Sequence, residues 1–376
     1  MQFIDLHAQY EQLKSEIDAG IVGVLAHSRY IGGPEVQRLE TELAEYLGVQ
    51  HAITCASGTD ALQLIYMAHG IGAGDAVFCP DVTFIASTEP ACMLGAEPVF
   101  CDITADTFTL DPDSLVRQIE VVRHEGRLTP RAVIAVDMLG NPAEYDRLAE
   151  ICREYGLLLV EDAAQSFGAE YHGHKCGALG DIAATSFFPA KPLGCYGDGG
   201  AVFTNDDEMA ALLRSLCVHG KGKAGKYSNA RIGLNSRFDT IQAAILLPKL
   251  HALRDYEMEL RQQTAKRYDD ALGDVFQPQQ ITDGTRSAYA QYALLAKNTV
   301  ERDAVCAYLT AKGIPNMVYY PKPQHELPVF AHTEQYGETF VNAKDYCART
   351  FSLPMHPYLS AEEQDKVIRA VREAVE

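Results

Sequence analysis

Short apolar runs alternate with longer segments of helical periodicity along this chain, and the alternation predicts an α/β fold. The runs Leu157–Val160 and Ile182–Phe188 are closed by polar and turn residues, which is typical of buried strands in a parallel sheet. Residues 11–27 instead carry apolar side chains at helical spacing, at Leu13, Ile17, Ile21, Val24 and Leu25. Repeated strand–helix units of this kind indicate a large, mostly parallel sheet with helices on both faces.

The segment from residue 51 to residue 70 predicts a strand, a turn and a helix. Ser57-Gly58-Thr59 would form the turn, and the helix would run from Asp60. A glycine-containing turn at a helix start presents backbone N–H groups to an anion. Serine and threonine are equally typical of a simple helix cap, so both interpretations stay open from the pattern alone.

The following stretch predicts a strand, a helix that begins near Thr83, and a second strand that ends at Asp102. Phe84 falls just after the first of these strands, where an isolated aromatic residue belongs by default to the core. Helices are then predicted over residues 111–125 and 147–156.

A helix rich in Ala, Ile and Leu leads to Pro248, and it predicts the approach to a second domain. We expect a large domain over residues 1–248, whose N-terminal helix packs toward a smaller α+β domain over residues 249–376. The small domain would close with an amphipathic helix over Ala361–Val375.

Composition narrows the class of protein. The chain has 376 residues, of which 47% are hydrophobic and 22% charged, as in ordinary globular proteins. A net charge of −19 argues against nucleic acid as a partner. The ten cysteines form no CxxC pair, so neither a zinc site nor a disulfide framework is indicated. The polar start is unlike a signal peptide, and no apolar run approaches the ~18 residues of a membrane helix. We therefore expect a cytoplasmic protein without a membrane partner.

One basic segment departs from this acidity. Residues 209–238 contain no Asp or Glu, but they hold Arg214, Lys221, Lys223, Lys226, Arg231 and Arg237. The lysines are explained equally well by a solvated loop and by a local positive field for an anionic ligand. We favour a binding role for Arg231 and Arg237, because they flank the segment GLNSRFDTIQAAI.

Two strand ends carry the candidate chemistry. Asp162 closes one predicted strand and Lys191 follows another, and the carboxyl ends of parallel strands line the ligand crevice of such a sheet. An amine and a carboxylate at one edge suit pyridoxal 5′-phosphate, which needs a Schiff-base lysine and a charge partner for its ring nitrogen. A lysine before a proline is more often a solvated loop residue, and a strand-end aspartate is as often a helix cap.

The segments EDAAQSFGA and TSFFPAKPLGCYGDGGAVFTND make the pattern specific, because together they resemble the DegT/DnrJ/EryC1/StrS family of sugar aminotransferases. The likeness extends from FIDLHAQY near the start of the chain to LPMHPYL near its end. It implies a transferase dependent on pyridoxal phosphate, with the fold of aspartate aminotransferase (fold type I). It also implies a homodimer with shared active sites.

The resemblance further assigns residues to the cofactor. Lys191 would hold it covalently and carry a proton during transamination, and Asp162 would pair with its ring nitrogen. The remaining contacts to the phosphate or the ring would come from Gly58, Thr59, Phe84, Gln165, Ser186 and, from the neighbouring subunit, Asn235.

Within this family, the amino-acid sequences of the motifs look closest to those of the branch that aminates UDP-2-acetamido-2-deoxy-3-oxo-glucuronate. The expected reaction moves the amino group of L-glutamate to C3 of that sugar, leaves 2-oxoglutarate, and serves bacterial surface polysaccharide (O-antigen) synthesis. A carboxylated sugar needs a cation, for which Arg237 and then Arg231 are the candidates. Tyr319 and His325, in the stretch YYPKPQH, would line the sugar site.

Three alternatives remain at this stage. The first is an aminotransferase for a dTDP- or GDP-linked 4-keto-hexose. The second is a sugar dehydratase on the same fold, which replaces the lysine with histidine, and Lys191 argues against it. The third is a non-catalytic regulator, which is disfavoured by the presence of both Lys191 and Asp162.

Overall fold

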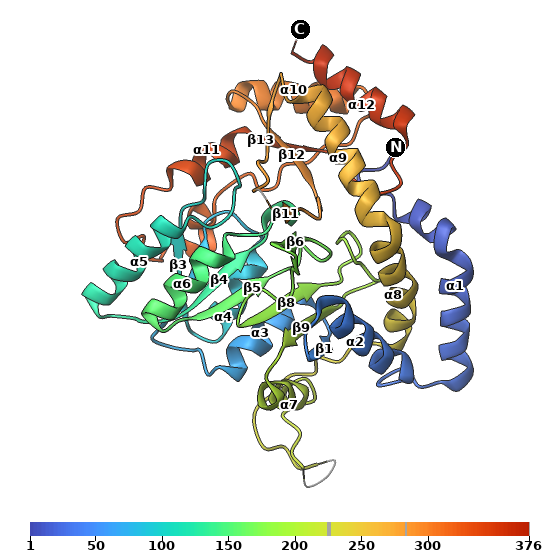
Figure 1. Ribbon diagram of the computed structural model, residues 1–376. Coiled ribbons are helices and arrows are strands. Elements are labelled where there is room, and N and C mark those ends of the chain that lie inside the picture. Colours follow the sequence, from blue (N-terminus) through green and yellow to red (C-terminus); the bar gives the residue numbers. More distant parts are fainter. Residues whose placement is uncertain (224–226, 283, 376) are drawn as a thin grey trace.

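The computed structural model describes residues 1–223, 227–282 and 284–375, and its centre is a seven-stranded sheet (Figure 1). The order across the sheet is β1-β9-β8-β5-β4-β2-β3. β9 pairs antiparallel with both of its neighbours, and the other pairings are parallel. The predicted large, mostly parallel sheet is therefore confirmed. The strands are β1 (His51–Cys55), β2 (Asp75–Pro80), β3 (Glu97–Cys101), β4 (Thr129–Val136), β5 (Leu158–Asp162), β8 (Ile182–Ser186) and β9 (Gly200–Thr204).

Helices cover both faces of this sheet, because the strands bury apolar side chains on each side in alternation. Along β4, Ile134 packs in a core with α3 (Gly58–Ala68) and α7 (Asp207–Leu216). Val133 packs in another with α5 (Pro112–Glu125) and α6 (Tyr145–Tyr155). A third core joins the β1–β9–β8 side of the sheet to α2 (Pro34–Leu47) and α8 (Thr240–Ala252).

The C-terminal part builds a smaller α+β unit with its own core. Its antiparallel sheet has the order β10-β12-β13, from β10 (Gln277–Pro278), β12 (Tyr292–Leu295) and β13 (Thr350–Leu353). Residues of α9 (Met258–Leu272), α10 (Thr299–Ala311) and α12 (Ala361–Glu373) pack with this sheet in one cluster. Between the two parts lie the short β6 (Glu170–Tyr171), β7 (His174–Lys175) and β11 (Thr285–Arg286), and α11 (Val341–Arg349) follows β12 and α10.

A continuous helical run joins the two parts. α8 passes through a π-helical turn at Leu253–Glu257 into α9, and Pro248 lies inside α8. α1 (Leu6–His27) packs along α8, and ahead of it the Phe3 carbonyl accepts a hydrogen bond from the Met355 N–H at 3.2 Å (Figure 1). The boundary after residue 248 stays a prediction, and it falls within a helix.

One predicted element differs. The helix expected from Thr83 is only a 3-10 turn at Ile85–Ser87, followed by the five-residue α4 (Glu89–Met93). The Thr83 and Ser87 hydroxyls hydrogen-bond to each other at 2.7 Å, and such local side-chain bonds compete with helical backbone pairing. The extended backbone of Phe84 leaves this aromatic residue at the sheet edge, 54% exposed, rather than in the core.

Among the described residues, the structure contains no helix with the length and apolar content that crossing a membrane requires.

Candidate active site

Asp162 and Lys191 meet at the carboxyl edge of the large sheet. Asp162 is the last residue of β5, and Lys191 lies in the loop after the neighbouring parallel strand β8. Asp162 is only 6% exposed, whereas Lys191 is partly exposed. Burial lowers the pKa of the Lys191 amine, and the negative charge of Asp162 opposes that effect. The two groups therefore lie at the same edge of the sheet, close enough for their charges to interact.

A short hydrogen-bonded network fixes the Asp162 carboxylate. The Ser87 hydroxyl donates to one oxygen at 2.7 Å, and the Ala164 N–H donates to the other at 3.1 Å. Burial raises the pKa of Asp162, while these hydrogen bonds and the nearby Lys191 lower it. A buried carboxylate of this kind suits a cationic partner that enters with a ligand, such as a protonated ring nitrogen.

The adjacent carboxylate has a different environment. Glu161 points to the opposite face of β5, where it is fully buried and accepts hydrogen bonds from the Gly177 and Leu179 N–H groups. Burial, and then the negative charge of Asp137, raise the pKa of Glu161 to about 8. Glu161 thus ties the segment after β7 to the sheet, and Asp162 alone faces the site.

The first turn of α3 lies against the end of β8. A Cβ atom on Gly58 would lie 2.7 Å from the Cβ of Ser186, so only glycine allows this close approach. The Ser57 side chain caps α3 by accepting the Asp60 N–H at 3.0 Å, and Thr59 lies in the same first turn. The N-terminus of α3 combines unpaired N–H groups with the positive end of the helix dipole, which fits a bound phosphate.

Phe84 and Gln165 are the other two expected cofactor contacts near this edge of the sheet. The Phe84 ring centroid lies 6.3 Å from that of Tyr320. Gln165 is 5% exposed, and its side-chain oxygen accepts the Leu139 N–H at 2.9 Å, which fixes the amide after β5. The residues present therefore fit pyridoxal phosphate, with an amine, a buried carboxylate, an exposed aromatic ring and a helix N-terminus at one edge.

Sequence reasoning missed two residues of the site. Ser87 holds the Asp162 carboxylate, and Tyr320 lies close enough for the charge of Asp162 to raise the pKa of its hydroxyl, after the larger effect of burial. The sequence feature that could have indicated Ser87 is the pair of hydroxyl residues four positions apart in TFIAS. The feature that could have indicated Tyr320 is its position next to Tyr319, which was already a candidate.

The residue expected to come from a neighbouring subunit, Asn235, and the two candidate partners of a sugar carboxylate lie on the surface. Asn235, Arg231 and Arg237 are all exposed, and Arg231 donates to the Ser215 hydroxyl at 2.6 Å. Arg237 makes no ion pair with any residue that the structure describes. Next to Asn235, the Ser236 hydroxyl accepts the Ala56 N–H at 3.1 Å, close to the turn before α3. Lys226 of the basic segment is outside the described residues.

Tyr319 and His325 are placed by packing contacts. Tyr319 is half-buried, with its ring centroid 6.1 Å from that of Phe3. His325 is buried. Its imidazole ring hydrogen-bonds to the Asp81 carboxylate, and its backbone N–H donates to the same carboxylate at 2.9 Å. His325 thus anchors the segment after Tyr320 to the carboxyl end of β2. Contact of either residue with a sugar stays a prediction.

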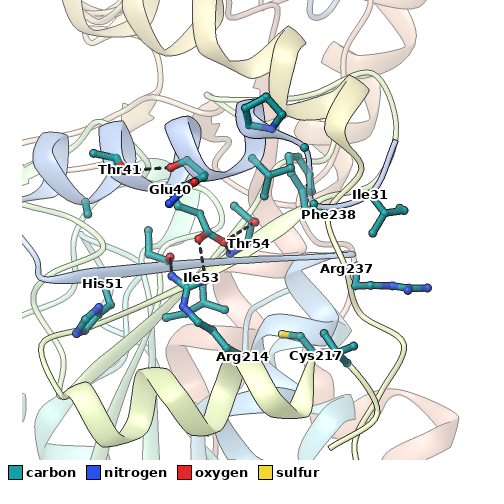
Figure 2. A pocket seen from close by; sticks show the side chains of 18 of the residues that line it. Ile31, Glu40, Thr41, His51, Ile53, Thr54, Arg214, Cys217, Arg237 and Phe238 are labelled. Atoms are coloured by element: carbon teal, nitrogen blue, oxygen red, sulfur yellow. Dashed lines mark hydrogen bonds and ion pairs between the residues drawn. The ribbon is translucent and has the colours of Figure 1, made fainter. Parts of the chain in front are cut away.

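A hollow of about 1000 Å³ lies elsewhere, between α2, β1 and the segment after α7 (Figure 2). Inside it, Glu40 accepts the Thr54 N–H at 2.9 Å and pairs with Arg214 at 2.7 Å, while Arg237 points away. Neither Lys191 nor Asp162 lines this hollow. It therefore lies apart from the amine and the carboxylate that carry the candidate chemistry, which we place at the strand ends.

Comparisons with known proteins agree with this geometry. The sequence profile of the DegT/DnrJ/EryC1/StrS aminotransferase family matches residues 11–372. A UDP-2-acetamido-2-deoxy-3-oxo-D-glucuronate aminotransferase from Pseudomonas aeruginosa is 46% identical over 96% of each chain. A pleiotropic regulatory protein from Geobacillus stearothermophilus is 40% identical over 98% of this chain and 97% of its own. The crystal structure of a DegT DnrJ EryC1 StrS aminotransferase from Brucella abortus superposes with a TM-score of 0.96, at 49% identity, over 99% of each chain.

Proposed function

Because the chain belongs to the DegT/DnrJ/EryC1/StrS aminotransferase family, we propose that it moves the amino group of L-glutamate to a keto group of a UDP-linked sugar. The substrate we propose is UDP-2-acetamido-2-deoxy-3-oxo-glucuronate, aminated at C3. The observation that carries the proposal is the placement of Lys191 near the buried Asp162 at one sheet edge, where each charge acts on the other. We place the reaction in the cytoplasm of a bacterium, in surface polysaccharide (O-antigen) synthesis.

The family's cofactor, pyridoxal 5′-phosphate, supplies an electron sink for the carbon that loses or gains the proton. Lys191 holds the cofactor, and its lowered amine pKa favours the neutral form that acts as a nucleophile and accepts a proton. Asp162 keeps a negative charge opposite the ring nitrogen. The first turn of α3, with Gly58 and Thr59, and the Ser186 hydroxyl hold the phosphate, and Phe84 and Gln165 contact the ring.

The choice of a uronate rests on charge. A sugar carboxylate pairs best with a guanidinium, and Arg237 is an exposed arginine with no ion pair to a described residue. Arg231 is the second candidate, although its guanidinium already donates to the Ser215 hydroxyl. The similarity to the Pseudomonas aeruginosa aminotransferase supports the same substrate.

A substrate panel tests this choice. The holoenzyme with ¹⁵N-labelled L-glutamate is given the UDP-linked 3-keto-glucuronate, its analogue without the carboxylate, and dTDP- and GDP-linked 4-keto-hexoses, and each amino sugar is detected by mass. We expect label in the first sugar, with kcat/KM at least ~10-fold above the analogue without a carboxylate, because one charge-assisted pair is lost. Label only in a 4-keto-hexose would replace the substrate and keep the reaction.

We also propose that the active site spans a homodimer, in which the exposed Asn235 of one subunit reaches the cofactor phosphate of the other. Ile232, on the same segment, is 86% exposed, and burial against a second copy would account for such an apolar surface residue.

Subunit mixing measures this sharing. Lys191→Ala and Asn235→Ala, each inactive alone, are unfolded and refolded together. Only the mixed dimer then has a site with both residues intact, so activity returns to about one quarter of the wild-type value, for random pairing with one good site per mixed dimer. Recovery below a few per cent, with mixed dimers present, would place both residues in sites that are not shared.

A further inference from the structure

Lys249 is a fully buried lysine in helix α8, on a stretch rich in leucine. It is 1% exposed and is surrounded along the helix by buried Leu246, Leu247 and Leu250. Burying a lysine is costly unless its amine is well bonded, because a charged group loses its hydration. The position therefore calls for an explanation from what its amine contacts.

The amine of Lys249 contacts the loop that carries Lys191. Its Nζ donates a hydrogen bond to the Gly194 carbonyl and lies 4.6 Å from the centre of the Tyr196 ring. α8 grips the same loop a second time through Gln242, whose side-chain oxygen accepts the Tyr196 N–H at 2.8 Å. Three residues after Lys191, the backbone is thus held by a buried cation.

The loop itself is tightly folded, so a contact at its end reaches Lys191. The Lys191 N–H donates to the Phe188 carbonyl at 2.9 Å, and the Cys195 N–H donates to the Phe187 carbonyl at 2.8 Å. A Cβ atom on Gly194 would lie only 2.4 Å from the Pro189 carbonyl oxygen. Lys191 therefore lies within a compact turn whose ends, at Phe187 and Cys195, are hydrogen-bonded to each other.

A buried anion balances this cation. Glu257, at the end of the π-helical turn, is 0% exposed, and its charge is felt at the Lys249 amine. One Glu257 oxygen accepts the Gln9 amide at 2.8 Å and also the Tyr358 hydroxyl, so α1 and the small domain meet at this carboxylate. The network runs from the small domain through α8 to the loop of Lys191.

We propose that Lys249 is a positioning residue, which aims the Lys191 amine at its reacting atom by holding the Gly194 carbonyl, with Glu257 as its counter-charge. The inference rests on the proposed role of Lys191. An error of 1 Å in the placement of a reacting group can slow a reaction by up to ~10²-fold, so such bracing acts on kcat more than on substrate binding.

The bracing depends on pH. Burial lowers the pKa of Lys249 to about 8, while Glu257 and Cys195 oppose that effect. The amine also lies over the ring of Tyr196, which belongs to the loop. Tyr10 and Asp18 of α1 lie close enough to Tyr196 for their charges to act on its hydroxyl. Above this pKa the neutral amine can still donate to Gly194, but the hydrogen bond is no longer charge-assisted and is weaker.

The test compares kcat and KM against pH for three holoenzymes, Lys249→Met, Glu257→Gln and the control Lys266→Met. Lys266 is exposed on α9, and its one ion pair with a described residue is with Asp270. In the wild-type enzyme we expect kcat to decline above about pH 8, as Lys249 loses its proton. We expect Lys249→Met to lower kcat about tenfold, to change KM less than about twofold, and to lack this decline in kcat. Glu257→Gln keeps the acceptor for Gln9 but removes the anion, so the decline moves to lower pH. The control matches wild type.

On the same samples, folding is measured by the melting temperature and cofactor content by the amount of enzyme-bound pyridoxal phosphate. A folded, loaded Lys249→Met enzyme with wild-type kcat and pH profile overturns the inference. Should Lys249→Met not fold, the test rests on Glu257→Gln, and an unchanged alkaline decline there overturns it as well. Failure of the proposed function is a different result, because the wild-type enzyme itself would then show no turnover.

Discussion

Replacing Lys191 with alanine should abolish transamination, with a loss of at least ~10⁴-fold in kcat, because one amine serves as both nucleophile and proton carrier. Among the described residues, Lys191 is the one lysine whose charge acts on Asp162, so no second described amine is placed to substitute. The measurement is the rate of 2-oxoglutarate formation from L-glutamate with saturating keto sugar.

Lys297→Ala is the matched control, since Lys297 is an exposed lysine whose only ion pair among described residues is with Glu301. It should retain the wild-type rate. A Lys191→Ala enzyme that keeps more than a few per cent of the rate, free of wild-type contamination, would remove Lys191 from the mechanism.

Asp162→Asn should lower kcat by about 10³-fold, the range seen when a fixed group that stabilises developing charge is removed from a dry site. Asparagine keeps the size of the side chain and can still accept from the Ser87 hydroxyl, but it carries no charge to hold a proton on a ring nitrogen. Single-turnover measurements with L-glutamate check the effect directly.

The same substitution has an opposite consequence for stability, which separates function from folding. Burial raises the folded-state pKa of Asp162 above that of the unfolded chain. The folded protein therefore binds more protons, and its stability falls as pH rises through that window. At pH 7 cofactor-free Asp162→Asn should melt at the same temperature as wild type or higher. A melting temperature several degrees lower would mean that the carboxylate is mainly structural.

The central architecture could be predicted from the sequence, because its signals are local. Apolar runs closed by turn residues gave the strands that end near Asp162 and Lys191, and helical periodicity gave α1 and α6. The family resemblance then pointed to the turn at Gly58, where the structure shows why no side chain larger than hydrogen fits, and its contact with phosphate stays a prediction.

The supporting residues could not be predicted, because they depend on contacts between distant segments. Ser87 bonds to Asp162, 75 positions away, and Lys249 bonds to Gly194, 55 positions away. Nothing in the local pattern of α8 distinguishes a buried lysine from one at a solvated helix end. The helix predicted from Thr83 failed for a different reason, because the local hydrogen bond between the Thr83 and Ser87 hydroxyls competes with helical backbone bonds.

The visible absorbance of the holoenzyme through one full catalytic cycle tests whether it transfers the amino group of L-glutamate through pyridoxal phosphate to the keto sugar. We expect a yellow band from cofactor bound to Lys191, its loss on addition of L-glutamate, and its return when the UDP-linked 3-keto-glucuronate is added. A protein that shows no such band with cofactor supplied, or a band that L-glutamate leaves unchanged, would contradict this expectation.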